Sequence, residues 1–206
     1  MQNINLTAID TIAKVMAESF KEDPLNLALL NGLSKKDELL QSHSKIHVKN
    51  AIKKGSLQLL DDDPRAFLVG VDSTHEKMID DIRLVINIYL STIFTLGWRD
   101  IRTIFANNKK TKGIVNFQWQ KEFLNGRFFR IKIVAVDKEL RETGAFRRLI
   151  TPVIELSDRS NIPLILETHN EKNVGLYEHF GFELVKTIES DSTDIKQYCM
   201  IRKPGP

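Results

Sequence analysis

The chain has 206 residues, of which 42% are hydrophobic and 28% are charged. These values are typical of a folded globular protein and exclude wholesale disorder and fibrous repeats. The 30 basic and 27 acidic residues give a formal net charge of +3, too small a surplus for a dedicated nucleic-acid-binding domain. The single cysteine, Cys199, excludes an intramolecular disulfide framework and a cysteine-based zinc site, and it fits a reducing compartment.

Helical spacing of apolar residues characterises the first part of the chain. Thr7 and Asp10 resemble a capping box at the start of one helix. Pro24 is expected to end that helix, because proline disfavours the helical conformation of the residue before it. The motif Ser34-x-x-Asp37 predicts the start of a second helix. Two short apolar runs around a polar turn then predict a β-hairpin, with strands at 56–60 and 66–71.

The most apolar segment spans residues 84–96 and reads LVINIYLSTIFTL. It includes four polar residues and is too short for a membrane-spanning helix, which needs about 20 apolar residues. We therefore interpret it as a buried helix within a helical insertion at about residues 76–124. The N-terminal residues contain no basic stretch followed by an apolar one, so we expect a cytoplasmic protein without a signal peptide and without a membrane partner.

The second half alternates β-type and helical runs. The expected order is β-α-β-α-β-β, with strands at 128–136, 162–168, 182–188 and 195–202 and helices at 141–160 and 170–180. Gly181 suits the C-terminal end of the second of these helices. This order predicts the α/β (α+β) class, and we expect residues 1–206 to form a single domain.

The first candidate site is a strand that enters a helix at a glycine. Residues 134–146 end a strand, cross a short polar loop and enter a helix at Gly144. A helix N-terminus exposes unpaired N–H groups and a partial positive charge. Glycine lets an anion approach the backbone, so this turn suits a phosphate or pyrophosphate. Arg141, Arg147 and Arg148 add positive charge, but for this segment alone an ordinary surface turn remains the alternative.

A second strand-to-helix junction follows at residues 166–183. Glu167 stands at the end of the strand, and Asn170 and Asn173 stand near the start of the helix. Tyr177 lies one helical turn before the glycine that ends this helix. Taken alone, it is more typical of a half-buried packing aromatic than of a catalytic residue.

Together the two junctions resemble the acetyl-CoA-binding core of the GNAT-type N-acetyltransferases. That superfamily has a loop Gln/Arg-x-x-Gly-x-Gly/Ala after its fourth strand, and here the sequence Arg141-Glu142-Thr143-Gly144-Ala145-Phe146 corresponds to it. Phe146 stands where the family has glycine or alanine. The spacing of the family's fourth helix is matched by Asn170 or Asn173, by Tyr177 and by Gly181-Phe182. The resemblance covers about residues 128–203.

The resemblance implies a mixed, mostly antiparallel central sheet with helices on both faces and a split between the strands at 131–136 and 162–168. It also implies that acetyl-CoA is the co-substrate and that its pantetheine arm enters the split. If the ring of Phe146 crowds the pyrophosphate, Phe146→Gly is expected to tighten CoA binding. The residues implied to bind the cofactor are Val134, Ala135, Val136, Arg141, Glu142, Thr143, Gly144, Ala145, Phe146, Asn170, Asn173 and Tyr177.

The implied reaction is direct transfer of an acetyl group to an amine of a small molecule or a peptide. Tyr177 matches the position that often protonates the departing thiolate. Glu167 is the best candidate for a base, with Asp137 as the next candidate. The expected catalytic residues are therefore Tyr177 and Glu167. A homodimer is left open.

Two other classes of function remain as alternatives. A GNAT-like acyl-CoA-binding or regulatory module with weak turnover is favoured by Phe146 and by the lack of a carboxylate on the strand at 131–136. A basic nucleic-acid-binding domain is more distant, and we expect no nucleic-acid partner. His43 and His47 have the spacing of half a metal site, but neither a third ligand nor the glutamate of an HExxH motif accompanies them, so we expect no metal.

Overall fold

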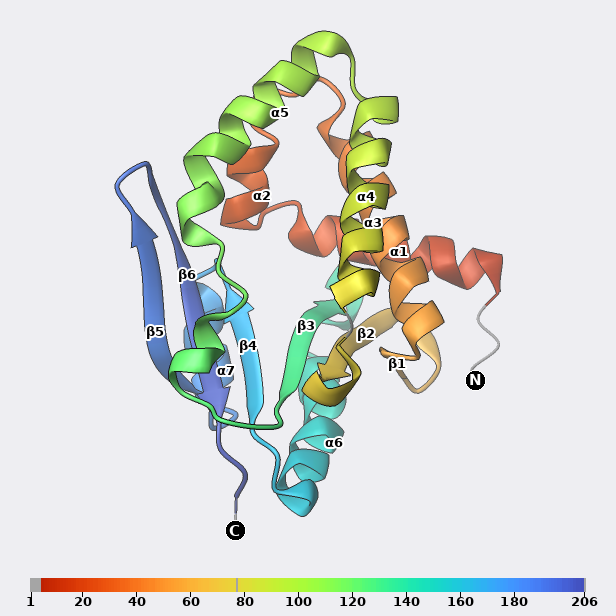
Figure 1. Cartoon of the computed structure of the whole chain (residues 1–206). Coiled ribbons are helices and arrows are strands. Elements are labelled where there is room, and N and C mark those ends of the chain that lie inside the picture. The colour runs from red at the N-terminus through yellow and green to blue at the C-terminus, as the bar shows by residue number, and fades with distance from the viewer. Residues whose placement is uncertain (1–4, 77, 206) are drawn as a thin grey trace.

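A single sheet of six strands organises the chain in this computed structural model (Figure 1). The structure describes residues 5–76 and 78–205, without the side chains of 78–81. The strand order is β1-β2-β3-β4-β6-β5. Only β3 and β4 pair in parallel, and the other neighbours are antiparallel. The strands are β1 Leu57–Leu60, β2 Asp63–Asp72, β3 Phe129–Val136, β4 Leu164–Thr168, β5 Glu183–Ser190 and β6 Thr193–Arg202. The predicted mixed, mostly antiparallel sheet is confirmed.

Seven α-helices accompany the described strands. Short 3-10 turns lie between them at Ser73–His75, Lys112–Ile114, Trp119–Glu122 and Lys138–Leu140. The α-helices are α1 Leu6–Phe20, α2 Pro24–Leu29, α3 Lys36–Lys54, α4 Met78–Thr95, α5 Trp98–Thr111, α6 Ala145–Ser160 and α7 Lys172–Glu178. The predicted order β-α-β-α-β-β of the second half is therefore observed.

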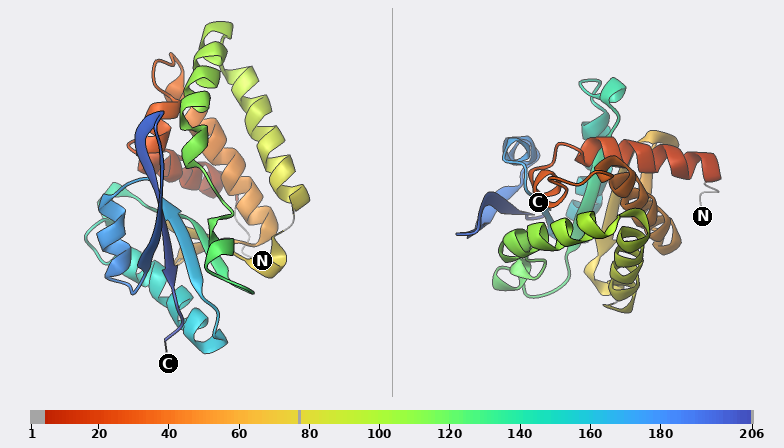
Figure 2. Two further views of the ribbon diagram at one scale, coloured as in Figure 1. Left: turned by 60° about the vertical axis from the view of Figure 1, so that its left-hand side comes forward. Right: turned by 90° about the horizontal axis from the view of Figure 1, so that it is seen from above.

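Helices cover both faces of the sheet, as predicted. On one face α6 packs on β2, β3 and β4, with Leu149 and Ile150 of α6 fully buried against Leu68 and Leu166. On the other face α1 and α3 pack on β2 and β3 around Phe67 and Ala135. The two further views show these layers (Figure 2). Strand β2 is central to both cores because its successive residues are buried on opposite faces.

A fork between β3 and β4 opens at their C-terminal ends (Figure 1). The two strands pair only from Phe129 to Ile131, opposite 164–166, and β3 then continues to Val136 with β2 as its neighbour. Lys132 is an extra residue in β3, because Val69 pairs with Ile133 while Gly70 pairs with Ile131. Such a bulge bends the strand and increases its twist. The predicted split is thus observed, and the bulge at Lys132 explains where it begins.

The starts of the N-terminal helices differ from the prediction. Asn5, and not Thr7, caps α1, and its side chain accepts a hydrogen bond from Ala8 N at 2.9 Å. Ser34 does not cap α3, because both its backbone N–H and its hydroxyl donate to the buried carboxylate of Asp100. Asp23 caps an additional helix, α2, in which Pro24 is the first residue. Proline suits that position since its missing N–H would have no partner there.

The apolar segment at 84–96 is helical, but the prediction that this helix is buried is wrong. In α4 the side chains of Val85, Ile86 and Tyr89 are about half exposed, and Phe94 is 84% exposed. Only Leu96, which follows the helix, is buried, against Leu33 and Leu39. The apolar composition signals a surface that must be covered, but nothing in the described part of the chain covers it. No helix among the described residues has the length and apolar character needed to cross a bilayer.

Candidate functional site

The turn before α6 is built to leave a helix N-terminus open. Thr143 donates its hydroxyl to the Leu140 carbonyl at 2.7 Å, and Arg141 Nε donates to the Val136 carbonyl at 3.3 Å. Gly144 then adopts the left-handed conformation, with φ +81°, and α6 starts at Ala145 rather than at the predicted residue 141. No side chain caps this end of α6. A Cβ at Gly144 would meet no atom within 4 Å, so the backbone faces open space.

The ring of Phe146 turns away from this open space. It packs edge-on against Tyr177, with ring centroids 5.8 Å apart, and against Phe180, at 5.3 Å. Tyr177 in turn packs on Phe182. The structure thereby brings the two predicted junctions together through their aromatic side chains. It also removes the basis for expecting the ring to crowd a pyrophosphate, because only the backbone of Phe146 faces the helix N-terminus.

The positive charges near the turn are used in different ways. Arg148 forms an ion pair with Asp61 in the β1–β2 turn. Arg147 hydrogen-bonds His179 at 2.8 Å, and its guanidinium lies over the ring of Phe180. Arg141 is exposed and holds only the Val136 carbonyl among the hydrogen bonds of the described residues. Of the three arginines, Arg141 is therefore the one best placed to meet an anion at the turn.

Residues Val134, Ala135 and Val136 line the open side of the fork. They pair with Leu68, Phe67 and Ala66 of β2, but they lie beyond the last residue that pairs with β4. A strand directs half of its backbone N–H and C=O groups to each side. Apart from the Val136 carbonyl, which accepts from Arg141, the groups on the fork side have no strand partner among the described residues and can pair with an extended ligand.

The helix after β4 holds the next set of predicted residues. Asn170 accepts a hydrogen bond from Lys172 N at 3.1 Å, and Asn173 donates to Thr168 Oγ1 at 3.2 Å, so both asparagines shape the junction. The side chain of Tyr177, a residue of α7, packs between Phe146 and Phe182 against the core beneath this helix. Burial raises the pKa of its phenol to about 12. Tyr177 therefore stays protonated throughout the physiological range.

Glu167 lies on the opposite face of the sheet from Tyr177, because its neighbour Leu166 faces α6. Its Oε1 accepts from Trp119 Nε1 at 2.6 Å and from the guanidinium of Arg130. Arg130 also donates to the Phe117 carbonyl and approaches Glu76. Burial raises the pKa of Glu167, while Arg130 and Trp119 oppose that shift. The predicted base is therefore part of a buried ion pair.

His169, which the sequence analysis did not single out, follows β4 at the mouth of the fork. Its Nε2 is buried and has no hydrogen-bond partner among the described residues. Burial lowers the pKa of His169, and the nearby Asp23 carboxylate opposes that shift. Asp23 itself is held by the N–H groups of Leu25 and Asn26 at the start of α2. A lone histidine after a strand carries no pattern, so the sequence offered no signal for this pair.

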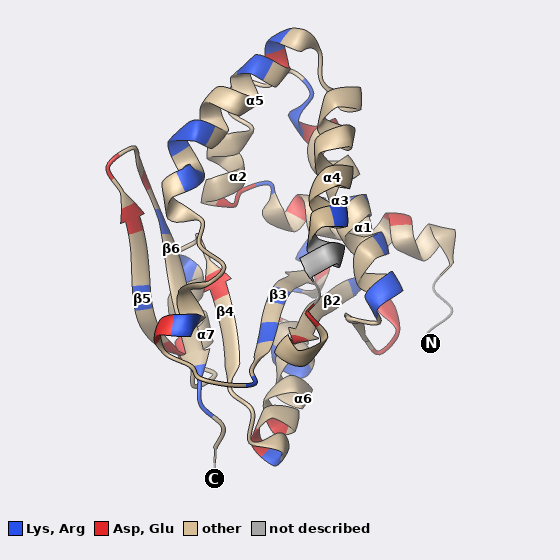
Figure 3. Cartoon of the chain, viewed as in Figure 1, with Lys and Arg blue, Asp and Glu red and all other residues tan. Residues whose placement is uncertain are grey.

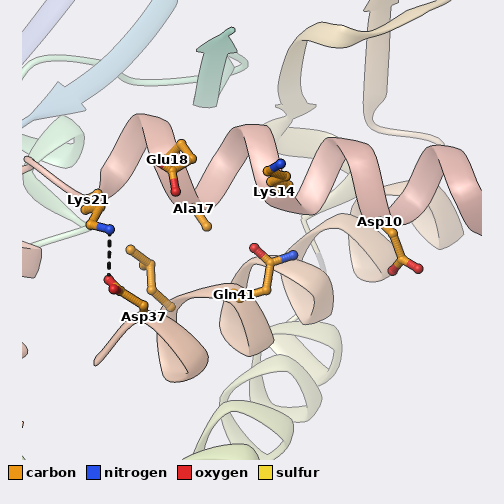
Figure 4. Close-up of a pocket in the computed structure, with 8 residues that line it drawn as sticks. Asp10, Lys14, Ala17, Glu18, Lys21, Asp37 and Gln41 are labelled. Atoms are coloured by element: carbon orange, nitrogen blue, oxygen red, sulfur yellow. Dashed lines mark ion pairs between the residues drawn. The ribbon is translucent and has the colours of Figure 1, made fainter. Parts of the chain in front are cut away.

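A hollow between α1 and α3 does not contribute to this site (Figure 4). It lies on the outer surface, where Lys21 pairs with Asp37 at 3.2 Å and Lys45 pairs with Asp10 at 2.5 Å. Three of its charged lining residues are therefore already in ion pairs, and none of its lining residues belongs to the turn before α6. The lining residues are Asp10, Lys14, Ala17, Glu18, Lys21, Asp37, Leu40 and Gln41.

No family model matches the chain. A curated relative, described as uncharacterized N-acetyltransferase C550.08 of Schizosaccharomyces pombe, is 33% identical over 73 residues, which is 34% of this chain and 30% of that protein. The matched region thus spans less than a third of the relative's length. A solved structure from Corynebacterium glutamicum, described as histone acetyltransferase HPA2 and related acetyltransferase, has a TM-score of 0.61 at 16% identity and covers 98% of this chain and 94% of that one.

Arylalkylamine N-acetyltransferase 2 of Aedes aegypti is similar to the same extent. Its TM-score is 0.58 at 18% identity, over 98% of this chain and 97% of that one. Both likenesses extend over nearly the whole chain and are therefore not confined to its second half. At such low identity they concern the arrangement of the backbone and not the substrate.

Proposed function

Because the chain has the fold of the GNAT-type N-acetyltransferases, we propose that it is a single-domain enzyme that moves an acetyl group from acetyl-CoA directly to an amine. One observation carries this proposal. The same strand, β3, provides the unpaired edge of the fork and leads into the open N-terminus of α6. Acetyl-CoA is a thioester with a long amide-containing arm and a pyrophosphate. The strand edge can pair with the amides of the arm, and the helix N-terminus that follows it along the chain can bind the pyrophosphate. Acceptors of two kinds fit, a small-molecule amine or a peptide amine.

The residues of the turn have distinct tasks in this proposal. The N–H groups of Gly144, Ala145 and Phe146 bind the pyrophosphate, and Arg141 neutralises part of its charge. Glu142 and Thr143 shape the turn that brings those groups together, since Glu142 has a φ of +65°. The edge of Val134, Ala135 and Val136 pairs with the amide groups of the pantetheine arm. Asn170 and Asn173 fix the junction that places α7 beside it.

Tyr177 is the proposed general acid. Its pKa of about 12 keeps the proton on the phenol until negative charge develops on the departing sulfur. Direct transfer needs both substrates in the fork at once, so positioning supplies much of the rate. The thioester enters on the face of α6 and α7, and the amine enters on the face of Glu167 and His169. The acetyl group then crosses from one face of the sheet to the other at the fork.

Two side chains on the amine face are candidates for the base. Glu167 stays a candidate, although as a base it would have to give up bonds to Arg130 or Trp119. His169 has a free ring nitrogen, and its lowered pKa makes the neutral imidazole available at neutral pH. If His169 is the base, kcat of the wild type falls as the pH drops through the lowered pKa of His169, so this acid limb lies below the usual histidine range. His169→Gln removes that limb. An acid limb that persists in the variant assigns the base elsewhere.

Binding is tested by thermal stability. A ligand at about 100 times its Kd stabilises the native state by about 2.7 kcal/mol, which for a chain of this size raises Tm by roughly 5–10 °C. CoA is expected to give such a shift in moderate salt, and Arg141→Ala is expected to reduce it. Arg159→Ala, at the other end of α6, is the matched control and leaves the shift intact. No shift at millimolar CoA would remove the proposal.

Turnover is tested separately, by thiol release with a panel of amines. Release with any acceptor supports the enzyme. A Tm shift with CoA but no release with any amine would instead identify the acyl-CoA-binding or regulatory module. The single buried Cys199 is compatible with the cytoplasmic location that we include in the proposal.

A further inference from the structure

Helix α4 places polar side chains against α3 and most of its large apolar side chains on the outside. On the side that faces α3, Ser91 Oγ and Ser42 Oγ are 2.7 Å apart, and Thr92 Oγ1 and His43 Nε2 are 3.0 Å apart. The opposite side is apolar and exposed. A helix on the surface of a monomer normally has the reverse arrangement. The exposed apolar side chains of α4, here called the α4 face, are Ile82, Val85, Ile86, Tyr89, Leu90, Ile93 and Phe94.

The α4 face contains a regular seam. Ile82, Ile86, Tyr89 and Ile93 are separated by four, three and four residues, which is the spacing of the inward positions of a coiled coil. Each of the four is between 47% and 54% exposed, so all of them reach the surface equally. As a partner for this seam, a second long helix fits the spacing, whereas a strand or an irregular loop does not.

We propose that the α4 face packs against the α4 face of a second copy of this chain, forming a two-fold symmetric dimer. The seven residues together expose on the order of 700 Å², which approaches the roughly 800 Å² that each partner contributes to a standard interface, whereas the largest apolar patch of a typical monomer is about 300–600 Å². Between Ile82 and Phe94 the one charged side chain is the exposed Arg83, near the start of α4. In an antiparallel pair the two copies of Arg83 lie toward opposite ends of the seam, so two copies of the α4 face meet without like charges directly opposed, as a two-fold interface requires. This inference is independent of the proposed function.

The positions of charged residues also indicate whether the two α4 helices of the dimer are parallel or antiparallel. Just beyond α4, helix α5 carries the exposed Arg99 and Arg102, and it carries Lys109 and Lys110 near its end (Figure 3). Parallel α4 helices would bring the two copies of Arg99 together. Antiparallel helices separate them and align the helix dipoles favourably. Ile82 of one copy then lies opposite Ile93 of the other, and the two-fold axis passes between Ile86 and Tyr89.

A lipid surface is the other covering that an apolar helix can have. Helices that lie in a membrane surface carry basic residues on the face opposite the apolar one. In α4 that opposite face instead holds Ser91 and Thr92, which hydrogen-bond to α3. A second copy therefore fits the described contacts better than a bilayer.

The mass of the full chain in solution tests the dimer. Sedimentation equilibrium of the wild type at micromolar concentration is expected to give twice the monomer mass. The double substitution Ile86→Glu and Ile93→Glu is expected to give the monomer, because four carboxylates would meet at the seam. Leu27→Glu, at a position in α2 that is 55% exposed, is the matched control and should remain dimeric. Circular dichroism shows whether each variant is folded.

A cysteine variant provides a second measurement if the charged variant fails to fold. Cys199 is buried and its pKa is raised to about 11 by burial, so it does not react under mild conditions. Ile86→Cys is expected to be cross-linked between copies by a short bis-maleimide, while Leu27→Cys is not. A monomeric wild type at every concentration overturns the proposal. A monomer that sediments with phosphatidylserine vesicles also overturns it and assigns the α4 face to lipid.

Discussion

The second half of the chain and the α4–α5 segment are both rich in apolar residues, but they use them in opposite ways. In the second half, the apolar faces of α6 and of β4 meet each other, and Leu149, Ile150 and Leu166 are fully buried or nearly so. In the α4–α5 segment, α4 directs Ile86, Tyr89 and Phe94 outward. The periodic pattern of apolar residues specifies a helix in both places. It does not specify whether the covering partner belongs to the same chain.

The same contrast applies to polar groups. In the second half, side chains with shifted pKa values, and backbone groups without hydrogen-bond partners among the described residues, gather near the C-terminal ends of β3 and β4. Gly144, Tyr177 and His169 lie there. In the α4–α5 segment, the polar side chains of Ser91 and Thr92 form hydrogen bonds to α3. Chemistry is therefore expected at the fork and association at α4, and variants in the two regions should separate these properties.

The largest effect is expected at Tyr177. Tyr177→Phe keeps the ring between Phe146 and Phe182 but removes the proton, so kcat should fall by about 10²–10⁴-fold with little change in CoA affinity. Steady-state kinetics with any active acceptor measure this loss. Because the pKa of the phenol is about 12, wild-type kcat should show no falling basic limb from Tyr177 up to about pH 10. Full activity of the variant at every pH would leave positioning as the main source of rate.

The next effect is expected in the free energy of unfolding at the ion pair of Glu167 and Arg130. The side chain of Arg130 is 5% exposed and that of Glu167 is 9% exposed. Glu167→Gln leaves the guanidinium without its main counter-charge and should destabilise the fold by about 3–5 kcal/mol, measured by urea denaturation. Adding Arg130→Met should restore part of that loss. A Glu167→Gln variant of normal stability but low activity would instead favour the role of Glu167 as the base.

A matched pair of truncations tests the contrast between the two regions directly. Ile150→Ala in α6 removes a side chain with no exposed area and should cost about 2–5 kcal/mol in unfolding free energy. Ile86→Ala in α4 should cost less than about 0.5 kcal/mol in the dilute monomer, because half of that side chain is already in water. Urea denaturation at two protein concentrations measures both. Equal costs in dilute solution would mean that α4 is covered within the chain.

The sequence predicted the second half well because its signals are local. The order of elements and the glycine turn at Gly144 follow from runs and spacings within about 30 residues, whereas the fork was expected only from the family resemblance. Other features could not be predicted in this way. The cap at Asn5 depends on a choice between nearby polar side chains. The hydrogen bonds of Ser34 to Asp100 and of Glu167 to Trp119 join residues far apart along the chain. Helix α2 was missed because Pro24 was interpreted only as the end of a helix, whereas α1 already ends at Phe20 and Pro24 is the first residue of α2.

The smallest effect is expected at Phe146, where the structure changes the expectation drawn from the sequence. The ring contacts Tyr177 and Phe180 and not the open backbone at Gly144, so Phe146→Gly should not tighten CoA binding. Phe146→Leu keeps most of the volume and loses the aromatic pairs, which are worth about 0.5–1.5 kcal/mol.

Urea denaturation measures the stability lost with the aromatic pairs of Phe146, and titration with CoA measures affinity. The CoA affinity of Phe146→Leu should stay within about twofold of the wild type, since the backbone N–H groups are unchanged. Leu176→Ala, at a 40% exposed position on α7, controls for a general loosening of that helix. A substantial gain in CoA affinity on removing the ring would mean that the phenyl group swings toward the turn when the cofactor binds. The aromatic contacts between the two junctions would then be a feature of the free protein, and Tyr177 would have to reach its working position without them.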